Sequence, residues 1–185
     1  MSDELQAQLD ALCGPEHESA GEPGRDPVNQ PMIRHWCDAM DDVNPVYTDP
    51  EFAEKSVHGG IVAPPTMLQA WTMRGLRLRD TDSVSRGPLG KVMELVESAG
   101  YTSVVATNCR QEYSRYLKPG DHLSHSHYIE SVSPEKQTAL GTGRFVTQVM
   151  VFRDQTGEEV ARMVFRILKF KPGTGRSAAA QEEMS

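Results

Sequence analysis

The chain has 185 residues, of which 38% are apolar and 24% charged, with a formal net charge of −7. This length and composition predict one globular domain with a core of its own, and no apolar stretch or leader pattern suggests membrane contact. Seven acids stand against Arg25 alone in the first 26 residues, and the rest carries no basic face that would favour nucleic acid.

The number and spacing of the cysteines indicate the redox state of the chain. Cys13, Cys37 and Cys109 are widely spaced and odd in number, which disfavours a disulfide framework or a zinc cluster. Cys109 lies in an apolar, strand-like run, so we expect it to be buried as a small hydrophobic residue. The composition favours a reduced, cytoplasmic protein.

Helical patterns come first along the chain. Residues 3–12 place three leucines on one helical face, and residues 14–28, rich in Gly and Pro, predict a loop or linker. A helix is expected after Pro31 and should end near Asp42, because Asn44-Pro45 disfavours α conformation. Asp49 is typical of the residue that caps a helix, here a short one through Lys55.

The longest predicted helix begins at Pro64-Pro65. Its apolar stripe is formed by Met67, Leu68, Trp71, Gly75 and Leu76, with Ala70 and Met73 broadening it. Such a helix would be buried nearly all round. A polar loop over residues 80–90 and a short helix over 91–98 should follow.

After Gly100 the pattern changes to strands. The predicted strand runs are residues 101–117, 121–133, 136–153 and 158–171, separated by turn signals such as Lys118-Pro119-Gly120-Asp121. In the last run Ala161, Met163, Phe165 and Ile167 should face the core, with Arg162 and Arg166 opposite. Helices followed by an antiparallel meander predict an α+β domain.

This pattern divides the chain into three parts. Residues 1–27 form an acidic N-terminal helix and linker, and residues 28–171 form the domain. Residues 172–185 have no pattern and predict a tail or the start of an interdomain linker.

Three motifs, in order, carry a family resemblance. They are Asp42-Val43-Asn44-Pro45, followed by Tyr47; Ile61-Val62-Ala63-Pro64-Pro65-Thr66; and Gln111-Glu112-Tyr113 through Pro119-Gly120-Asp121. Together they resemble the MaoC-like (R)-specific enoyl-CoA hydratases, whose signature is Asp-x-Asn-Pro-x-His-x-Asp. The resemblance covers roughly residues 28–171 and implies a hot-dog fold, in which an antiparallel sheet wraps a long central helix.

The resemblance implies a defined chemistry, from which this chain departs. Hydration of a 2-enoyl thioester needs a base for the water and an acid for the α-carbon, roles that an Asp and a His can share. Tyr47 occupies the histidine position, and a phenol with a pKa near 10 is a poor proton shuttle. Pro64 and Pro65 have no N–H for an oxyanion, which leaves the amides of Thr66 and Met67.

The resemblance therefore implies a degenerate unit that takes its Asp/His dyad from a partner. Residues 27–36 extend the similarity to the larger subunits of heteromeric members that act on steroid side-chain (cholesterol-derived) CoA esters. That similarity implies a smaller catalytic hot-dog subunit as partner, a bulky steroid-type 2-enoyl-CoA as substrate and no cofactor. It also implies docking of a thiolase-like aldolase through a further C-terminal domain.

The candidate site residues follow from the same motifs. Asp42 and Tyr47 occupy the catalytic positions, and the expected substrate contacts are Asn44, Pro65, Thr66, Met67 and Trp71. Two other readings stay open, since Asp42 and Asn44 are also typical helix caps and Tyr47 is equally consistent with packing. A functional role for His58, in a Gly-rich loop, is a less favoured alternative.

Three other functions remain open. A self-sufficient hydratase would use Asp42, with Tyr47 or a water replacing the histidine. A non-enzymatic acyl-CoA-binding or assembly module would bind without turnover, and a thioesterase would release a free thiol.

Several remaining features are weaker signals. His122 is expected to point away from His125 and His127 on a strand, and no Cys or carboxylate cluster accompanies them, which disfavours a metal site. Gly141 and Gly143 suggest a close backbone approach, such as one to a neighbouring subunit. The basic residues Arg166, Lys169 and Lys171 fit either CoA phosphates or a solvated strand end.

Overall fold

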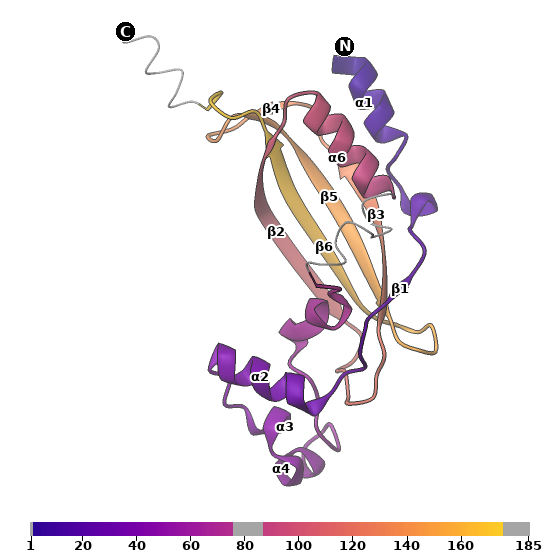
Figure 1. The fold of residues 1–185 in the computed structure, drawn as a ribbon, viewed down its shortest axis with the longest axis vertical. Coiled ribbons are helices and arrows are strands. Elements are labelled where there is room, and N and C mark those ends of the chain that lie inside the picture. The colour runs from indigo at the N-terminus through magenta and orange to yellow at the C-terminus, as the bar shows by residue number, and fades with distance from the viewer. Residues whose placement is uncertain (1, 76–86, 176–185) are drawn as a thin grey trace.

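A computed structural model describes residues 2–75 and 87–175 of the chain. Its centre is an antiparallel sheet with the strand order β1-β3-β5-β6-β2, in which β4 pairs with β5 (Figure 1). The strands are β1 (Glu22–Pro23), β2 (Ser103–Tyr113), β3 (Ser124–Val132), β4 (Lys136–Gln137), β5 (Thr142–Arg153) and β6 (Glu159–Phe170). The α+β hot-dog class expected from the sequence is confirmed.

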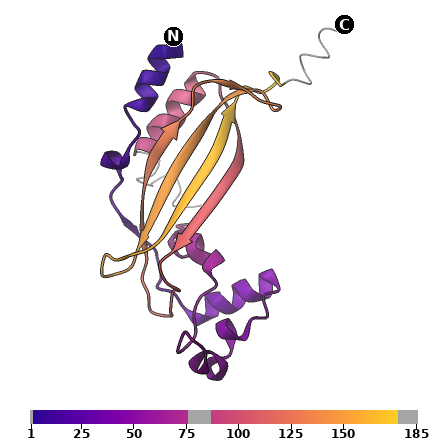
Figure 2. The ribbon, with the colours of Figure 1, turned by 180° about the vertical axis from the view of Figure 1, so that it is seen from behind.

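The helices fall into two groups, at opposite ends of the sheet. They are α1 (Ser2–Asp10), α2 (Gln30–Met40), α3 (Pro45–Thr48), α4 (Pro50–Lys55) and α6 (Pro88–Ser98), with 3-10 turns η1 (Pro15–His17) and η2 (Pro65–Thr72). Helices α1 and α6 lie together on one face of the sheet, and α2 to α4 cluster beyond its other end (Figures 1 and 2). No helix within the described residues is long and apolar enough to cross a bilayer.

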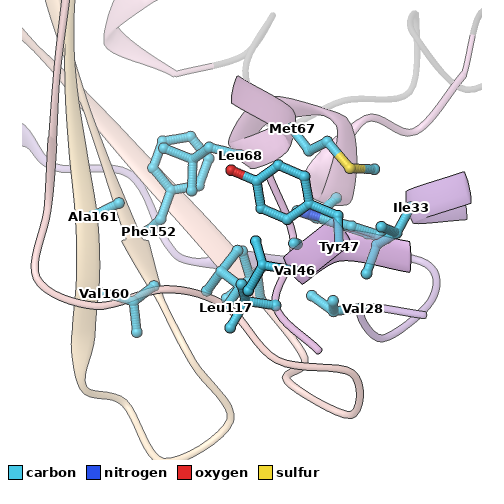
Figure 3. Close-up of a cluster of buried hydrophobic side chains, with 14 of the residues drawn as sticks. Val28, Ile33, Val46, Tyr47, Met67, Leu68, Leu117, Phe152, Val160 and Ala161 are labelled. Carbon is cyan, nitrogen blue, oxygen red and sulfur yellow. The ribbon is translucent and has the colours of Figure 1, made fainter. Parts of the chain in front are cut away.

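Two apolar clusters match these two groups. The first joins α2–α4 and η2 to the sheet end through residues such as Tyr47, Leu117 and Phe152 (Figure 3). The second lies under α1 and α6 and contains Leu9 and Ile129. As predicted, the alternate residues of β6 from Ala161 to Ile167 belong to these clusters, so one face of the strand is the core face.

The long helix predicted from Pro64 is wrong in kind and length. Residues 65–72 form an eight-residue 3-10 helix, η2, which ends because Met73 is extended and Gly75 takes a φ of +81°. Met67, Leu68 and Trp71 are buried as expected, but Met73 is 68% exposed. Leu76 lies outside the described residues. The α-helix that covers the sheet is instead α6, where only a short helix was expected.

Helix caps and N-terminal contacts follow the local chemistry. The side chain of Asp49 accepts hydrogen bonds from the amides of Glu51 and Phe52, so α4 begins where the sequence predicted. The predicted loop after α1 is bonded along β3, since the amides of Ser19 and Gly24 donate to carbonyls of that strand and its preceding loop. The division at residue 27 and the tail from 172 remain predictions, and residues 176–185 lie outside the described part.

The position of β2 corrects the expected burial of Cys109, and the backbone contacts of two glycines explain the close approach expected there. Strand β2 is the sheet edge, and Cys109 is exposed rather than buried. The close approach at Gly141 and Gly143 is internal, because a Cβ at either position would lie 2.4 or 2.6 Å from a carbonyl oxygen of Lys171 or Lys169. No neighbouring subunit is needed to explain these glycines.

Gly24 provides a test of the contact between the N-terminal segment and η2. A Cβ at this position would lie 2.2 Å from the carbonyl oxygen of Trp71, so we expect Gly24→Ala to lower the free energy of unfolding by about 1–3 kcal/mol. Urea unfolding measures this difference. Gly21→Ala is the matched control, because its Cβ would meet only Ser124 atoms at 3.9 Å or more. Equal stability of the two variants would contradict the packing described.

Candidate functional site

Asp42 and Asn44 serve the backbone around them. The Asp42 carboxylate accepts a hydrogen bond from the Asn44 amide at 3.1 Å, and the Asn44 side chain accepts one from the Val46 amide at 3.2 Å. Asp42 follows the left-handed residue Asp41, which ends α2, and Asn44 caps α3. Both predicted site residues therefore do what capping residues do, and Asn44 is exposed.

Tyr47 lies in the first apolar cluster. Its side chain is 8% exposed and is surrounded by Val46, Met67 and Leu117 (Figure 3). Burial raises the pKa of the Tyr47 phenol, and nearby Tyr116 and Asp42 raise it further. A hydrogen bond with the Asn44 side chain opposes this rise in pKa, but the phenol is still neutral at physiological pH and is a poor proton shuttle.

The entry to η2 offers little to an oxyanion. The Met67 amide donates to the Pro64 carbonyl at 3.0 Å, so one of the two amides that the sequence left available is occupied. Thr66 is exposed, whereas Met67 and Trp71 are 1% and 3% exposed and belong to the core. The predicted contacts thus gather around η2, with only Pro65 and Thr66 near the surface.

Pro65 lines a small hollow that the sequence indicated only in part. Its volume is about 90 Å³ and its walls are Ala63, Pro65, Tyr113, Arg115, Tyr116 and Leu117. The ring of His58 lies 4.5 Å from that of Tyr116, which brings the Gly-rich loop to the same place. Tyr113 and Tyr116 were not among the predicted site residues, although they shortly precede the Lys118-Pro119-Gly120-Asp121 turn of the third motif.

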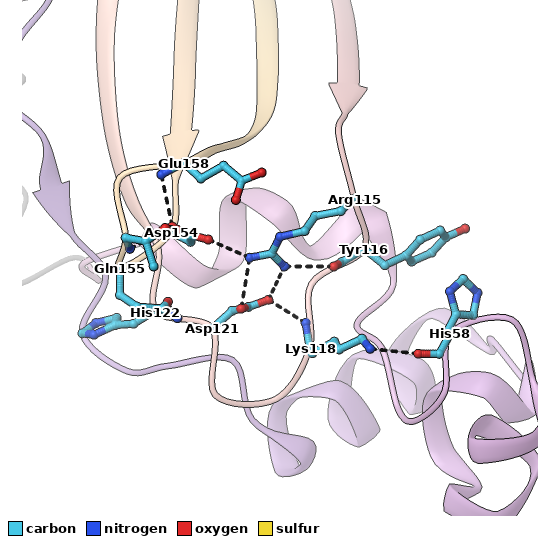
Figure 4. Close-up of polar contacts among 10 residues, drawn as sticks. His58, Arg115, Tyr116, Lys118, Asp121, His122, Asp154, Gln155 and Glu158 are labelled. Atoms are coloured by element: carbon cyan, nitrogen blue, oxygen red, sulfur yellow. Dashed lines mark hydrogen bonds and ion pairs between the residues drawn. The ribbon is translucent and has the colours of Figure 1, made fainter.

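Arg115 fixes the loop that forms this hollow. Its guanidinium donates to both carboxylate oxygens of Asp121, at 2.6 and 3.1 Å, and to Asp154 at 2.9 Å (Figure 4). Hydrogen bonds from Thr156, followed by the contact with Arg115, lower the pKa of Asp154 to about 2. Lys118 continues the network by donating to the His58 carbonyl at 2.8 Å. The hollow is therefore preorganised by charge-assisted hydrogen bonds between separate loops.

A second apolar surface lies on the helix-bearing face of the sheet. A hollow of about 120 Å³ is lined by Leu89, Met93, Val146, Gln148, Phe165 and Ile167. Beside it runs β2, whose residues are exposed along almost its whole length. Cys109 pairs with Phe165 across the strands, so the exposed surface of β2 continues that of the hollow.

The three histidines near β3 form no metal site. No group of three or more metal-binding side chains occurs among the residues that the structure describes. His122 bonds to the Gly24 carbonyl, whereas His125 and His127 are stacked at 6.5 Å. Of the three basic residues that fit either CoA phosphates or a solvated strand end, Lys169 is 3% exposed and bonded to Glu97 at 2.7 Å, so it does not lie at a solvated strand end.

His125 and His127 give an expected pH dependence of stability. Burial lowers the pKa of His125 and of His127, Glu22 opposes this for both, and Arg74 lowers that of His125 further. The unfolded chain therefore binds protons near pH 6.5 that the folded chain rejects, so stability is full above this pH and is lost below it.

We expect the melting temperature to fall between pH 7.5 and 5.5, and to fall less in a His125→Gln/His127→Asn variant. His35→Gln, at an exposed position, is the control and should keep the full pH dependence. An unchanged slope in the double variant would exclude this origin.

Comparison with known proteins adds the following findings. Residues 16–163 match the family "FAS1-like, dehydratase domain region". The chain is 50% identical over 160 residues to the 3-oxo-4,17-pregnadiene-20-carboxyl-CoA hydratase alpha subunit of Mycobacterium tuberculosis, covering 85% of this chain and 50% of the relative. It is 47% identical over 172 residues to a probable enoyl-CoA hydratase alpha subunit of Thermomonospora curvata, covering 92% and 53%. The chain thus spans about half the length of these curated relatives.

Solved structures agree with this family. A chain in the crystal structure of the ChsH1-ChsH2 complex from Mycobacterium tuberculosis matches with a TM-score of 0.79 and 46% identity, over 92% of this chain and 96% of that one. The R-hydratase PhaJ1 from Pseudomonas aeruginosa matches with a TM-score of 0.51 and 14% identity, over 83% and 80%, which supports the fold alone. The chain therefore belongs to the FAS1-like dehydratase family, with the MaoC-like hot-dog fold.

Proposed function

We propose that this chain is the non-catalytic half of a heteromeric (R)-type enoyl-CoA hydratase and shapes the acyl-binding site of the complex. A smaller hot-dog subunit supplies the Asp/His dyad. The observation that carries the proposal is the position of Tyr47, which occupies the family's histidine position and is buried among apolar side chains. Asp42, the other dyad position, is engaged by the backbone amide of Asn44.

The open sheet edge supports a partner of the same fold. Strand β2 has 11 residues, pairs with β6 on one side only, and is exposed on both faces. An exposed edge of this length presents unpaired N–H and C=O groups to the edge of another sheet. The relative of known structure is crystallised as a ChsH1-ChsH2 complex, which is consistent with a second subunit.

The apolar surface beside β2 supports a bulky acyl substrate. The hollow lined by Phe165 and Met93 lies beside the exposed strand β2, since Phe165 pairs with Cys109 of that strand. A relative is named for a pregnadiene carboxyl-CoA, a steroid thioester. We therefore propose a steroid-type 2-enoyl-CoA as substrate, with coenzyme A entering as part of the substrate and no separate cofactor.

Two further parts of the proposal concern a second partner and the cellular location. The relatives are about twice as long as this chain, so we propose that a further C-terminal domain of the natural protein docks a thiolase-like aldolase. We also propose a cytoplasmic location, where coenzyme A thioesters are metabolised.

The proposal is tested by measuring hydration of a steroid-type 2-enoyl-CoA by this chain, by the smaller subunit and by their mixture. We expect turnover in the mixture at least 100-fold above either subunit alone, and no loss on Asp42→Ala. His58→Ala, next to Tyr116, should also leave the activity of the mixture unchanged.

The other outcomes identify the rival functions. Turnover by the chain alone that is lost in Asp42→Ala or His58→Ala would establish a self-sufficient hydratase. Acyl-CoA binding without turnover in any combination would establish a binding or assembly module. Release of free thiol, without formation of a hydroxyacyl product, would establish a thioesterase.

A further inference from the structure

A second cavity lies away from the proposed acyl site, where α1 and α6 meet the far end of the sheet. Its volume is about 500 Å³, and its lining residues are Leu5, Leu95, Ser98, Ala99, Tyr101, Glu135, Arg144 and Lys171. Helices α1 and α6, which run side by side in both views (Figures 1 and 2), supply Leu5, Leu95 and Ser98 to its wall. A volume of this size accommodates a small organic molecule.

The unusual feature of this cavity is the charge of Arg144. This side chain is 1% exposed, and it is held by neutral acceptors: Nε donates to the Tyr101 hydroxyl at 3.2 Å, and Nη1 donates to Gln6 and to the Ser133 carbonyl. Among the residues that the structure describes, no carboxylate forms an ion pair with Arg144 and no acceptor is bonded to Nη2. The Glu135 carboxylate reaches Arg144 only through the Tyr101 hydroxyl, so an anion in the cavity would give this buried charge a direct counter-ion.

The neighbouring residues show how this fold neutralises a buried cation elsewhere. Lys169 lies opposite Arg144 in the β5–β6 ladder and is also buried, but its Nζ donates to Glu97 at 2.7 Å. Glu135, the one acid that lines the cavity, instead accepts a hydrogen bond from Tyr101 and lies 3.7 Å from Lys171. The cavity wall therefore carries two cations against one carboxylate.

The remaining wall determines what kind of anion would fit. Leu5, Leu95 and Ala99 provide hydrocarbon from two helices, while the cations come from the strand side at Arg144 and Lys171. A ligand with one anionic end and an apolar body satisfies both sides of this cavity. From this arrangement we propose that the cavity binds a small monocarboxylate with a hydrocarbon body, its carboxylate held by Arg144 Nη2 and Lys171 Nζ.

Octanoate is a suitable probe, with octan-1-ol and inorganic phosphate as separate arms. Titration of the full chain, followed by calorimetry and by amide NMR shifts, should show saturable binding of octanoate with shifts at Tyr101 and Ser98. Octan-1-ol and phosphate should each bind at least tenfold more weakly, because each lacks one half of the ligand. Equal binding of either probe would overturn the proposal, as would absence of octanoate binding.

Matched variants keep the test independent of Arg144, whose substitution would disturb the fold. Lys171→Gln should weaken octanoate binding five- to tenfold through loss of a charge-assisted hydrogen bond. Lys136→Gln, whose Nζ lies over Phe145 instead, should have no effect. Ala99→Phe should abolish binding by filling the cavity. Octanoate binding unaffected by both Lys171→Gln and Ala99→Phe would place the ligand elsewhere, for example beside Met93, and would overturn the proposal.

Discussion

Replacing Phe152 by alanine is expected to lower the free energy of unfolding by about 3–5 kcal/mol. The side chain is fully buried where β5 meets η2 and the α2–α4 helices, in the same cluster as Tyr47 and Leu117 (Figure 3). Its removal combines a loss of apolar burial with a cavity that the surrounding side chains fill only in part. Denaturant unfolding followed by circular dichroism measures the change.

Phe52→Ala is the matched control for this prediction. Phe52 lies in α4 and is 51% exposed, so the same change of side chain should cost less than about 1 kcal/mol. Comparable losses at Phe52 and Phe152 would mean that the helical segments do not pack against the sheet end as described.

Proline substitution at one of two neighbouring positions in β2 is expected to prevent assembly with the proposed smaller subunit. In an antiparallel strand, successive residues point their N–H groups in opposite directions, here toward β6 or toward the open edge. Of Cys109→Pro and Arg110→Pro, the one whose N–H faces β6 should destabilise the fold. The other should keep its melting temperature within a few degrees and weaken partner binding at least 100-fold.

Alanine variants at the same two positions separate backbone from side-chain effects. Cys109→Ala and Arg110→Ala keep the N–H groups, so both should bind the partner within a few fold of the parent chain. Binding is measured by surface plasmon resonance with the smaller subunit immobilised. If both proline variants are folded and bind normally, the partner does not use the β2 edge.

Most strands were predictable because their patterns are local, although the run predicted over residues 136–153 divides into β4 and β5 around a turn at Gly141. Alternation from Ala161 to Ile167 and the turn at Pro119-Gly120 depend only on residues near in sequence, and the structure confirms both. The cap at Asp49 is equally local, since its carboxylate reaches amides only two and three residues away.

Other features depend on distant partners and could not be read from the sequence. The prediction that Cys109 is buried was wrong because an apolar strand pattern does not reveal which strand is the sheet edge. The Arg115 network joins residues 6 and 39 positions apart, so a local sequence pattern does not reveal that they pair. The prediction of a long α-helix from Pro64 was wrong because an apolar stripe over so few residues does not distinguish α from 3-10 geometry. In addition, Gly75 adopts a positive φ that ends any helical conformation.

The candidate site was likewise predictable only in part. The sequence brought Asp42, Tyr47 and the η2 entry together as one region, and Tyr47 and Met67 do belong to one cluster. The roles assigned to these residues remain predictions. The same sequence pattern fits a carboxylate that caps a helix and one that acts in catalysis, and only the substrate and partner distinguish the two roles.

The two-sided exposure of β2 has a consequence for how the protein must be produced. An unpaired strand of this length can template pairing with other copies of itself, and charges such as Arg110 and Glu112 are its main protection. Chain synthesised in excess of its proposed partner is therefore prone to aggregation and to removal by proteases.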